Sequence, residues 1–334
     1  MTAVPLPRGA ERRGVPPWLA LALVVIGGAG AAAQVAVNAE LGTRLDSPLS
    51  ATVVSNTVGG AIFVVALCVF PRVREGVARA WRDRLPWWLY TGGMFGAVFV
   101  FAGAYAGPLV GVAVFTVAQV CGNSLGALAT DAAGLGPGGR LRVTPARLLA
   151  ALSAIGAVAV AQAGRDVTGR MWWLVPVIMV IGASLALQGA FNGRVNEITG
   201  NPVSTGFVNF VSGTGVLYVV TAVIAVLGGV PGVTLPAEPW LYLGGVFGAA
   251  LVVFSMIAVR VIGVLRMALG ILAGQLAGAL VLDVVLGHPP SPWVAAGVLL
   301  TAGAVALASM SRAAQTGTSP GQPVASKHES VRRS

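Results

Sequence analysis

The sequence predicts an all-α membrane protein with ten transmembrane helices, arranged as two inverted five-helix repeats. Three observations predict this fold class: a strongly apolar composition, ten apolar segments of helical length, and an internal duplication. Of the 334 residues, 56% are hydrophobic and only 10% are charged. Because a soluble domain carries about 25% charged residues, the composition places most of the chain in a membrane.

The apolar segments are each about 20 residues long, the length with which a helix crosses about 30 Å of hydrocarbon. Several begin with a capping side chain and a proline, as at Ser47-Pro48, Thr144-Pro145, Asn201-Pro202 and Ser291-Pro292, a combination typical of helix starts. Seven of the eight tryptophans fall at segment starts, where amphipathic rings prefer the membrane interface. The predicted spans are 18–38, 48–70, 87–107, 109–131, 145–164, 172–193, 202–227, 239–259, 263–286 and 292–311.

The internal duplication relates residues 27–60 to residues 181–214 at a constant offset of 154 positions. A second match, WLYTGGMFGA with WLYLGGVFGA, has an offset of 152. A unit of about 150 residues is too long and too apolar for a solenoid repeat, so it divides the membrane part into residues 18–164 and 172–311. The matched positions include Gln34 with Gln188, Asn38 with Asn192, and Trp88 with Trp240.

The basic residues indicate the orientation. With the N-terminus in the cytoplasm, eighteen arginines and lysines fall on cytoplasmic segments and three fall outside, which is the bias that cytoplasmic loops show. Ten spans then put both termini in the cytoplasm, and five spans per repeat insert the second unit upside down. Residues 1–17 are expected to form a cytoplasmic tail, since reading them as a signal peptide conflicts with the matching mid-chain segment. Residues 312–334 are expected to be disordered.

Several function classes are disfavoured by the residues present. The net charge of +10 comes mainly from arginines between apolar runs, which form no basic face for nucleic acid. Cys68 and Cys121 lie inside apolar runs and predict neither a disulfide nor a metal site. No glycine-rich loop carries a Lys-Ser or Lys-Thr pair for a nucleotide. We therefore expect no enzyme, no cofactor, no metal and no nucleic-acid partner.

The repeats also resemble a known family. Each has Gln-x-x-x-Asn in its first span, Ser-Pro or Asn-Pro at the start of its second, and Gly-Asn or Gly-Gln followed by Asp in its fourth. In this the chain resembles the YdcZ-like branch of the drug/metabolite transporter (DMT) superfamily over about residues 18–311, with two five-helix units fused. The resemblance implies a ten-helix bundle with a central polar cavity that exports by alternating access, but it implies no particular substrate. The first repeat departs from the pattern, because Gly122-Asn123 replaces Gly-Gln and Gln119 lies one turn earlier.

Seven intramembrane amides are the candidate substrate-binding residues. An unsatisfied polar group in hydrocarbon costs several kcal/mol, so each amide either faces a solute in a cavity or joins two helices, where such bonds contribute about 0.6–2 kcal/mol. The sequence leaves both interpretations open. Counting about 1.5 Å of rise per residue from the span ends, we predict two clusters on opposite sides of the midplane. These are Gln34 and Asn38 with Gln275, and Gln188 and Asn192 with Asn123 or Gln119.

Other polar residues receive a structural interpretation. Asn56 and Asn209 are expected to hold helices together. Asp131 and Asp283 end the fourth and ninth spans, where a charge at the headgroup boundary is expected and proton or cation coupling is the alternative. Small-residue ladders, such as Gly122-x3-Gly126 and Gly270-x3-Gly274-x3-Gly278, predict close helix contacts. Expected at the membrane interface are Glu40, Arg194, Arg260 and Arg266.

The sequence therefore predicts a secondary transporter in a bacterial inner membrane that exports a small polar, zwitterionic or amphipathic metabolite. The absence of an acid in the middle of the first and sixth spans favours a neutral or zwitterionic solute, since charges inside membranes usually mark ion pathways. The alternative is a non-transporting scaffold or a lipid-flippase-like protein, and a scaffold would hold Gln34 and Gln188 in a dry bundle. The expected partners are the lipid bilayer and a small-molecule substrate, and homodimerisation is left open.

Overall fold

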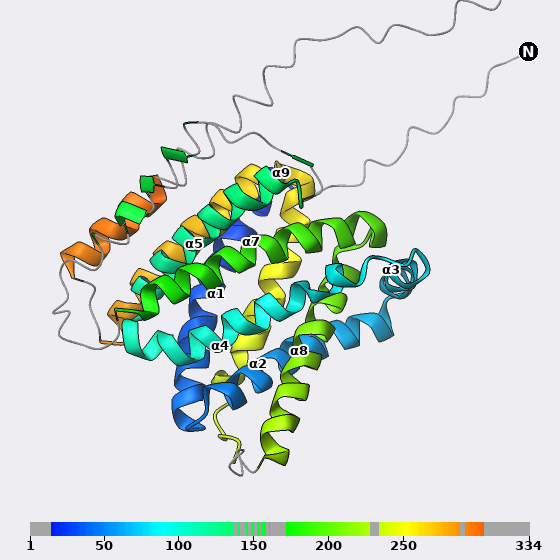
Figure 1. The fold of residues 1–334 in the computed structure, drawn as a ribbon, viewed down its shortest axis with the longest axis horizontal. Coiled ribbons are helices and arrows are strands. Elements are labelled where there is room, and N and C mark those ends of the chain that lie inside the picture. Colours follow the sequence, from blue (N-terminus) through cyan, green and yellow to red (C-terminus); the bar gives the residue numbers. More distant parts are fainter. Residues whose placement is uncertain are drawn as a thin grey trace, which may run out of the picture.

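The computed structural model is an all-helical bundle in the residues that it describes, which are 15–136, 139–140, 145, 148–149, 152–153, 155–157, 160, 172–227, 234–287 and 291–303. For residues 256, 259–260, 263–266 and 268–269 only the backbone is described. Most of both predicted tails, most of the predicted span 145–164, the link 165–171 and the end of the last span lie outside the described residues. The elements (Figure 1) are α1 (Pro17–Arg44), α2 (Pro48–Val69), α3 (Pro71–Arg82), η1 (Trp87–Thr91), α4 (Gly92–Val110), α5 (Val112–Ala133), α7 (Leu174–Thr199), α8 (Pro202–Val226), η2 (Pro239–Tyr242), α9 (Leu243–Val285) and the helix Pro292–Gly303.

Six helices of the described chain are long and apolar enough to cross a membrane. They coincide, within a few residues, with the predicted spans that begin at 18, 48, 87, 109, 172 and 202. Large apolar side chains are exposed on their outer faces, among them Ile26, Val65 and Val226, as expected where lipid takes the place of water. Shorter apolar helices occupy Pro239–Ser255, Gly270–Val285 and Pro292–Gly303.

Three predicted helix starts are confirmed by their caps. The Ser47 hydroxyl accepts a hydrogen bond from the Ser50 N–H at 3.1 Å. The Asn201 side-chain oxygen accepts one from the Val203 N–H at 2.9 Å, and the Ser291 hydroxyl accepts one from a backbone N–H in the next turn. Each cap satisfies a backbone donor that the first helical turn leaves free. The proline that follows has no backbone N–H, and at this position no intrahelical hydrogen bond is lost by its absence.

The segment between α2 and η1, expected as a cytoplasmic link, contains the helix α3. Its buried residues Val73, Gly76 and Ala80 share one face, because residues three and four apart are neighbours on a helix. That face packs on the turn between α7 and α8, where the Ser204 hydroxyl donates to the Val73 carbonyl at 2.9 Å. The Tyr90 hydroxyl donates to the Ala80 carbonyl at 3.0 Å.

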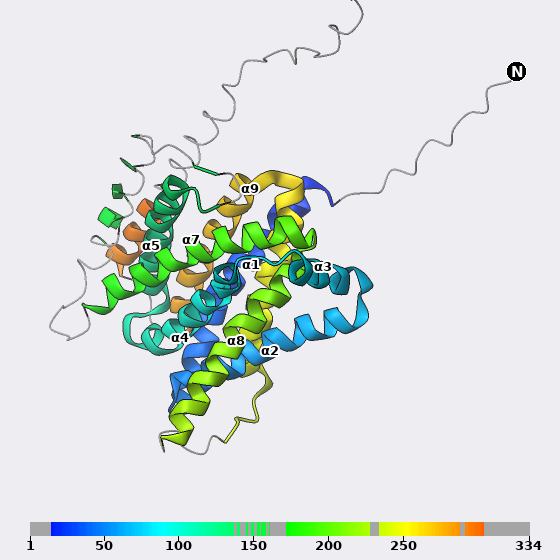
Figure 2. The same ribbon diagram turned by 45° about the vertical axis from the view of Figure 1, so that its right-hand side comes forward.

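Helix α9 is continuous in secondary structure where a break between two spans was expected. A straight helix of 43 residues would be about 65 Å long, about twice the hydrocarbon thickness of a bilayer. A methyl group built on Gly30 would lie 3.5 Å from Phe247, whereas one built on Gly278 would lie 3.1 Å from the Cβ of Ala29. Since Ala29 and Gly30 are neighbours, α9 must fold back around α1, and Figures 1 and 2 show this reversal in the yellow and orange ribbon. We call residues 243–255 the first arm of α9 and Gly270–Val285 its second arm.

The helices form two packing groups. In the first packing group, α1 packs against both arms of α9. In the second, α7 packs against α4 and α5, and Figures 1 and 2 show α7 running beside α5. Each group therefore joins the first helix of one repeat to the third and fourth helices of the other.

Glycines at repeat-matched positions make these contacts close. A methyl group built on Gly122 of α5 would overlap the Met179 carbonyl of α7. One built on Gly274 of α9 would overlap the Val25 carbonyl of α1 in the same way. Both glycines belong to the predicted ladders, so the expected close helix contacts are confirmed there.

Candidate functional site

Gln34 of the first repeat and Gln188 of the second line one cavity. Its volume is about 170 Å³, which is below the about 300–1,000 Å³ of typical ligand pockets and fits a small solute. Among the described residues that line it, none is charged. They are Gln34, Ser55, Asn56, Gly93, Gly96, Phe99, Val100, Leu185, Gln188, Asn209, Phe210, Gly248, Leu251 and Val252.

Two glycines leave the space that the glutamines occupy. A methyl group built on Gly96 of α4 would lie 2.7 Å from the Gln188 Nε2, and one built on Gly248 of α9 would lie 2.9 Å from the Gln34 Nε2. Both distances are too short for a real Cβ, so any larger residue would displace the amide. Gly96 and Gly248 are 152 positions apart and match in the duplication. The same device thus holds both glutamines, each against the third span of the other repeat.

The two glutamines differ in their hydrogen bonding. Gln188 Nε2 donates to the Asn209 Oδ1 at 3.0 Å, and the Asn209 side chain is 9% exposed. Within the described chain, Gln34 makes no side-chain hydrogen bond, although it is only 8% exposed. Its amide therefore has both donor and acceptor capacity left for a molecule in the cavity.

Asn38 lies one turn beyond Gln34 and deeper in the protein. It is 1% exposed, as is Ser55, and neither the Asn38 Oδ1 nor the Ser55 Oγ has a hydrogen-bond partner among the described residues. A methyl group built on Gly244 of α9 would come too close to both atoms. At the matched place, a methyl group built on Gly92 would lie 3.0 Å from the Asn192 Oδ1. Asn38 and Asn192 thus lie at the helix crossings beside the cavity rather than in its described lining.

The predicted grouping of the amides into two separate clusters is wrong. Gln275, expected beside Gln34, instead donates from Nε2 to the Gln119 Oε1 at 2.6 Å, and this bond is buried. It joins α9 of the first packing group to α5 of the second. Depth counted from the span ends could not find this pair, because it depends on which faces of α5 and α9 meet. Asn123, one turn beyond Gln119, is half-buried and makes no side-chain hydrogen bond within the described chain.

Sequence reasoning missed three lining residues, Ser55, Asn56 and Asn209, which were interpreted as packing residues or not considered. A usable signal was present for two of them. Asn209 corresponds to Ser55 at the offset of 154. Both are polar, and each lies on the helix that follows the helix of a matched glutamine. Repeat matching of polar positions, rather than identity alone, would have pointed to them.

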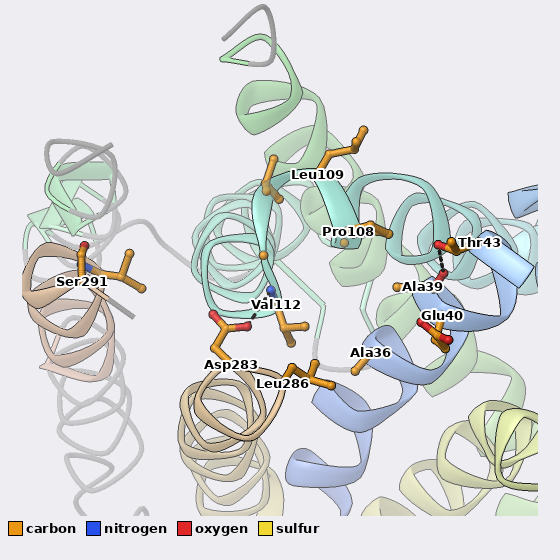
Figure 3. A pocket seen from close by; sticks show the side chains of 14 residues that line it. Ala36, Ala39, Glu40, Thr43, Pro108, Leu109, Val112, Asp283, Leu286 and Ser291 are labelled. Carbon is orange, nitrogen blue, oxygen red and sulfur yellow. Dashed lines mark hydrogen bonds between the residues drawn. The ribbon is translucent and has the colours of Figure 1, made fainter. Parts of the chain in front are cut away.

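A second and larger cavity of about 710 Å³ lies among the ends of α1, α4, α5 and α9. Figure 3 shows that Asp283 points toward Val112 at the start of α5, and Glu40 and Thr43 lie on the other side of the cavity. The Asp283 carboxylate accepts hydrogen bonds from the Val112 and Ala113 N–H groups, each at 3.1 Å. A carboxylate at this place suits the partial positive charge of a helix N-terminus. Asp283 is only 6% exposed, so it caps α5 from a buried position.

Arg44 and Arg194 each hold together the end of a packing group. The Arg44 guanidinium pairs with Glu40 at 2.8 Å and with Glu238, and it lies 5.6 Å above the Trp240 ring. Arg194 donates to the Gly134 carbonyl at 2.8 Å and lies 5.9 Å above the matched ring of Trp88. Hydrogen bonds from its own backbone N–H and from Arg44 lower the pKa of the Glu238 carboxyl.

An apolar helical bundle with a polar cavity shared by two repeats is the architecture expected of a membrane transport protein. The chain matches the model of the family described as "Putative inner membrane exporter, YdcZ" over residues 19–160 and 173–309. It belongs to this family, which confirms the resemblance to the YdcZ-like branch with two fused units. The chain is accordingly a multi-pass inner-membrane protein of a family described as exporters, which is a family of transporters rather than enzymes.

Two further comparisons complete this assignment. Comparison with curated proteins gave no match. A solved structure titled "Crystal structure of protein" is 18% identical, with a TM-score of 0.57, and the match covers 90% of this chain and 98% of that one. At this identity the likeness concerns the fold alone.

Proposed function

We propose that the chain exports a small polar, zwitterionic or amphipathic solute, which binds in the Gln34–Gln188 cavity and crosses the membrane by alternating access. One observation carries the proposal: the matched glutamines of the two repeats meet in one uncharged cavity, and each faces a matched glycine. Amides that can donate and accept suit a neutral or zwitterionic solute. Phe99 and Phe210 add apolar surface to the lining, which suits an amphipathic one.

The architecture proposed with this function has ten spans in two inverted five-helix repeats, with both termini in the cytoplasm. The duplication and the eighteen-to-three distribution of basic residues support it. The reversal of α9 supports it further, since it provides two membrane crossings where the secondary structure is one helix. Inverted repeats commonly place the substrate site at their interface, and the glutamine cavity lies between the repeats.

Cysteine accessibility from each side of the membrane tests whether the cavity is hydrated. In a background with Cys68→Ser and Cys121→Ala, we would introduce Gln34→Cys or Gln188→Cys and measure the labelling rate with a small charged thiol reagent in right-side-out and inside-out vesicles. Val65→Cys, whose side chain is exposed on the apolar surface of α2, is the matched lipid-facing control. We expect both cavity positions to react much faster than the control, because a transport pathway contains water. If neither reacts faster than Val65→Cys, the core is dry and the scaffold alternative holds.

A further inference from the structure

The contacts between the two packing groups are unequal. With α2, which packs on α1 and α9, assigned to the first group and α8, which packs on α4 and α7, to the second, the contacts that join the groups include α2 with α8, α5 with α9, and α1 with α4. The first two contacts each join a helix to its own repeat-matched partner, so exchanging the two repeats gives the same contact again. The third should have a counterpart between α7 and the first arm of α9, but α7 lies apart from α9 throughout the described residues.

The contact between α1 and α4, which we call the α1–α4 seam, is tightly closed. Val35 is 2% exposed and Ala39 is 7% exposed. Methyl groups built on Gly103 and Gly107 of α4 would lie 3.4 Å and 3.3 Å from the Val35 side chain. The glycines thus form a groove that receives the Val35 side chain, beneath the larger cavity that Ala39 and Gly107 also line.

The matched face of α7 is open. Val35 corresponds to Gly189 at the offset of 154. Gly189 is exposed, and a methyl group built on it would meet none of the described residues within 4 Å. It directly follows Gln188, so the open face begins beside the cavity.

The larger side chain and the glycine change places between the two matched contacts. In the α1–α4 seam the side chain belongs to α1 and the groove to α4. On the other side α7 carries Gly189, while Gly103 corresponds to Ser255 of α9 at the offset of 152. A side chain on α9 could therefore enter a glycine position on α7, the reverse of the arrangement in the α1–α4 seam.

We propose, resting on the transport function proposed above, that these two faces are alternating gates and that Val35 and Gly189 determine which one is shut. In this structure the α1–α4 seam is shut and the α7–α9 gate is open. Val35 lies in the half of α1 nearer its C-terminus, which the basic residues place outside, and Gly189 lies in the half of α7 that they place inside. The structure is therefore the state open to the cytoplasm, and transport requires α7 to pack on the first arm of α9.

The geometry yields a matched pair of variants. Gly189→Leu and Gly215→Leu each add the same bulk at a position where a built methyl group meets no described residue within 4 Å. Both are therefore tolerated in the state described here. Only Gly189→Leu should prevent closure of the α7–α9 gate, since Gly215 lies on α8. The converse variant Gly103→Leu should prevent closure of the α1–α4 seam.

The test uses Gln34→Cys as the reporter, labelled with a membrane-impermeant maleimide in inside-out and right-side-out vesicles. Glu75→Cys and Ala237→Cys, both exposed positions, report the sidedness of the vesicles. We expect the reporter to react mainly from the cytoplasmic side. Gly189→Leu should reduce labelling from outside by about tenfold or more, while Gly215→Leu leaves it unchanged and Gly103→Leu increases it.

The outcomes separate this proposal from the function on which it rests. Preferential labelling from outside, or equal effects of Gly189→Leu and Gly215→Leu, would overturn the gate assignment and leave the hydrated cavity intact. If the Gln34→Cys reporter reacts from neither side, the transport function itself fails. Elution of each variant as one sharp peak in detergent excludes misfolding as the cause.

Discussion

Asp283 joins the two packing groups through backbone hydrogen bonds. Its two carboxylate oxygens accept from consecutive N–H groups of α5 while Asp283 itself lies on α9. Hydrogen bonds to a charged acceptor are stronger than neutral ones. The residue that precedes α5 is Gly111, whose φ of +82° suits glycine, and glycine has no side chain that could cap the helix. The cap must therefore come from another helix.

We predict that Asp283→Asn lowers the free energy of unfolding by about 1–2 kcal/mol, because an amide can accept only one of the two bonds and lacks the charge. Glu40→Gln is the control, since it removes a carboxylate that lines the same cavity but forms an exposed ion pair, worth about 0.2–1 kcal/mol. Unfolding in detergent with increasing dodecyl sulfate measures both. Equal stability of Asp283→Asn and the parent would show that the cap contributes nothing.

The buried pair Gln119–Gln275 yields a second prediction at this scale. Gln275→Leu should destabilise the protein by about 1–2 kcal/mol, because it leaves the Gln119 Oε1 without a donor in an apolar environment. The double variant Gln119→Leu with Gln275→Leu should regain most of the loss, since it leaves no unpaired amide. The same unfolding assay gives the coupling energy. Additive losses would mean that the two amides act independently of their hydrogen bond.

At the residue level the sequence singled out the amides but did not predict how they meet. Gln34 and Gln188 were singled out because they recur, and the structure places both in one cavity. Their separation into two clusters failed because depth along a helix says nothing of its rotation or tilt. Gln119 with Gln275, and Gln188 with Asn209, are contacts between helix faces, and faces are set by packing across the whole bundle.

Among the elements, the glycine ladders decide how closely the helices approach. Gly274→Ala should destabilise the protein by about 1–3 kcal/mol, as overpacking does, because its methyl group would overlap the Val25 carbonyl. Gly215→Ala is the matched control, since it meets nothing within 4 Å and should gain about 0.5–1 kcal/mol from the better helix former. Thermal unfolding in detergent distinguishes the two. If both variants gain stability, the approach of α1 and α9 is looser than described.

Helix boundaries were predictable where local chemistry sets them. Ser47, Asn201 and Ser291 cap helices as their sequences indicate, because the capping bond needs only neighbouring residues. The helix α3 was missed, since its arginines conceal a short buried face that becomes apparent only against the turn between α7 and α8. The two arms of α9 were predicted as separate spans. The sequence did not reveal that the helix continues through the bend between them.

At the scale of the whole molecule, the duplication predicted the two repeats but not how they interlock. Each packing group takes its first helix from one repeat and its third and fourth from the other. This exchange of helices follows from two close contacts, Gly122 with Met179 and Gly274 with Val25. Matching the two repeats in sequence cannot distinguish such interlocked groups from two separate five-helix bundles.

The path of α9 provides a prediction about the whole molecule, because it determines how the second repeat crosses the membrane. The contacts of Ala29 and Gly30 require the two arms to run antiparallel beside α1, so the reversal between the arms should lie on one side of the membrane and both ends of α9 on the other. Ala237, Val261 and Leu286 are exposed and lie before the first arm, between the arms and after the second arm. We expect Val261→Cys to react from the cytoplasmic side, and Ala237→Cys and Leu286→Cys from outside. Sided maleimide labelling in vesicles checks each position. Reaction of Ala237→Cys and Leu286→Cys from opposite sides would mean that α9 crosses only once, and the second repeat would then not cross the membrane five times.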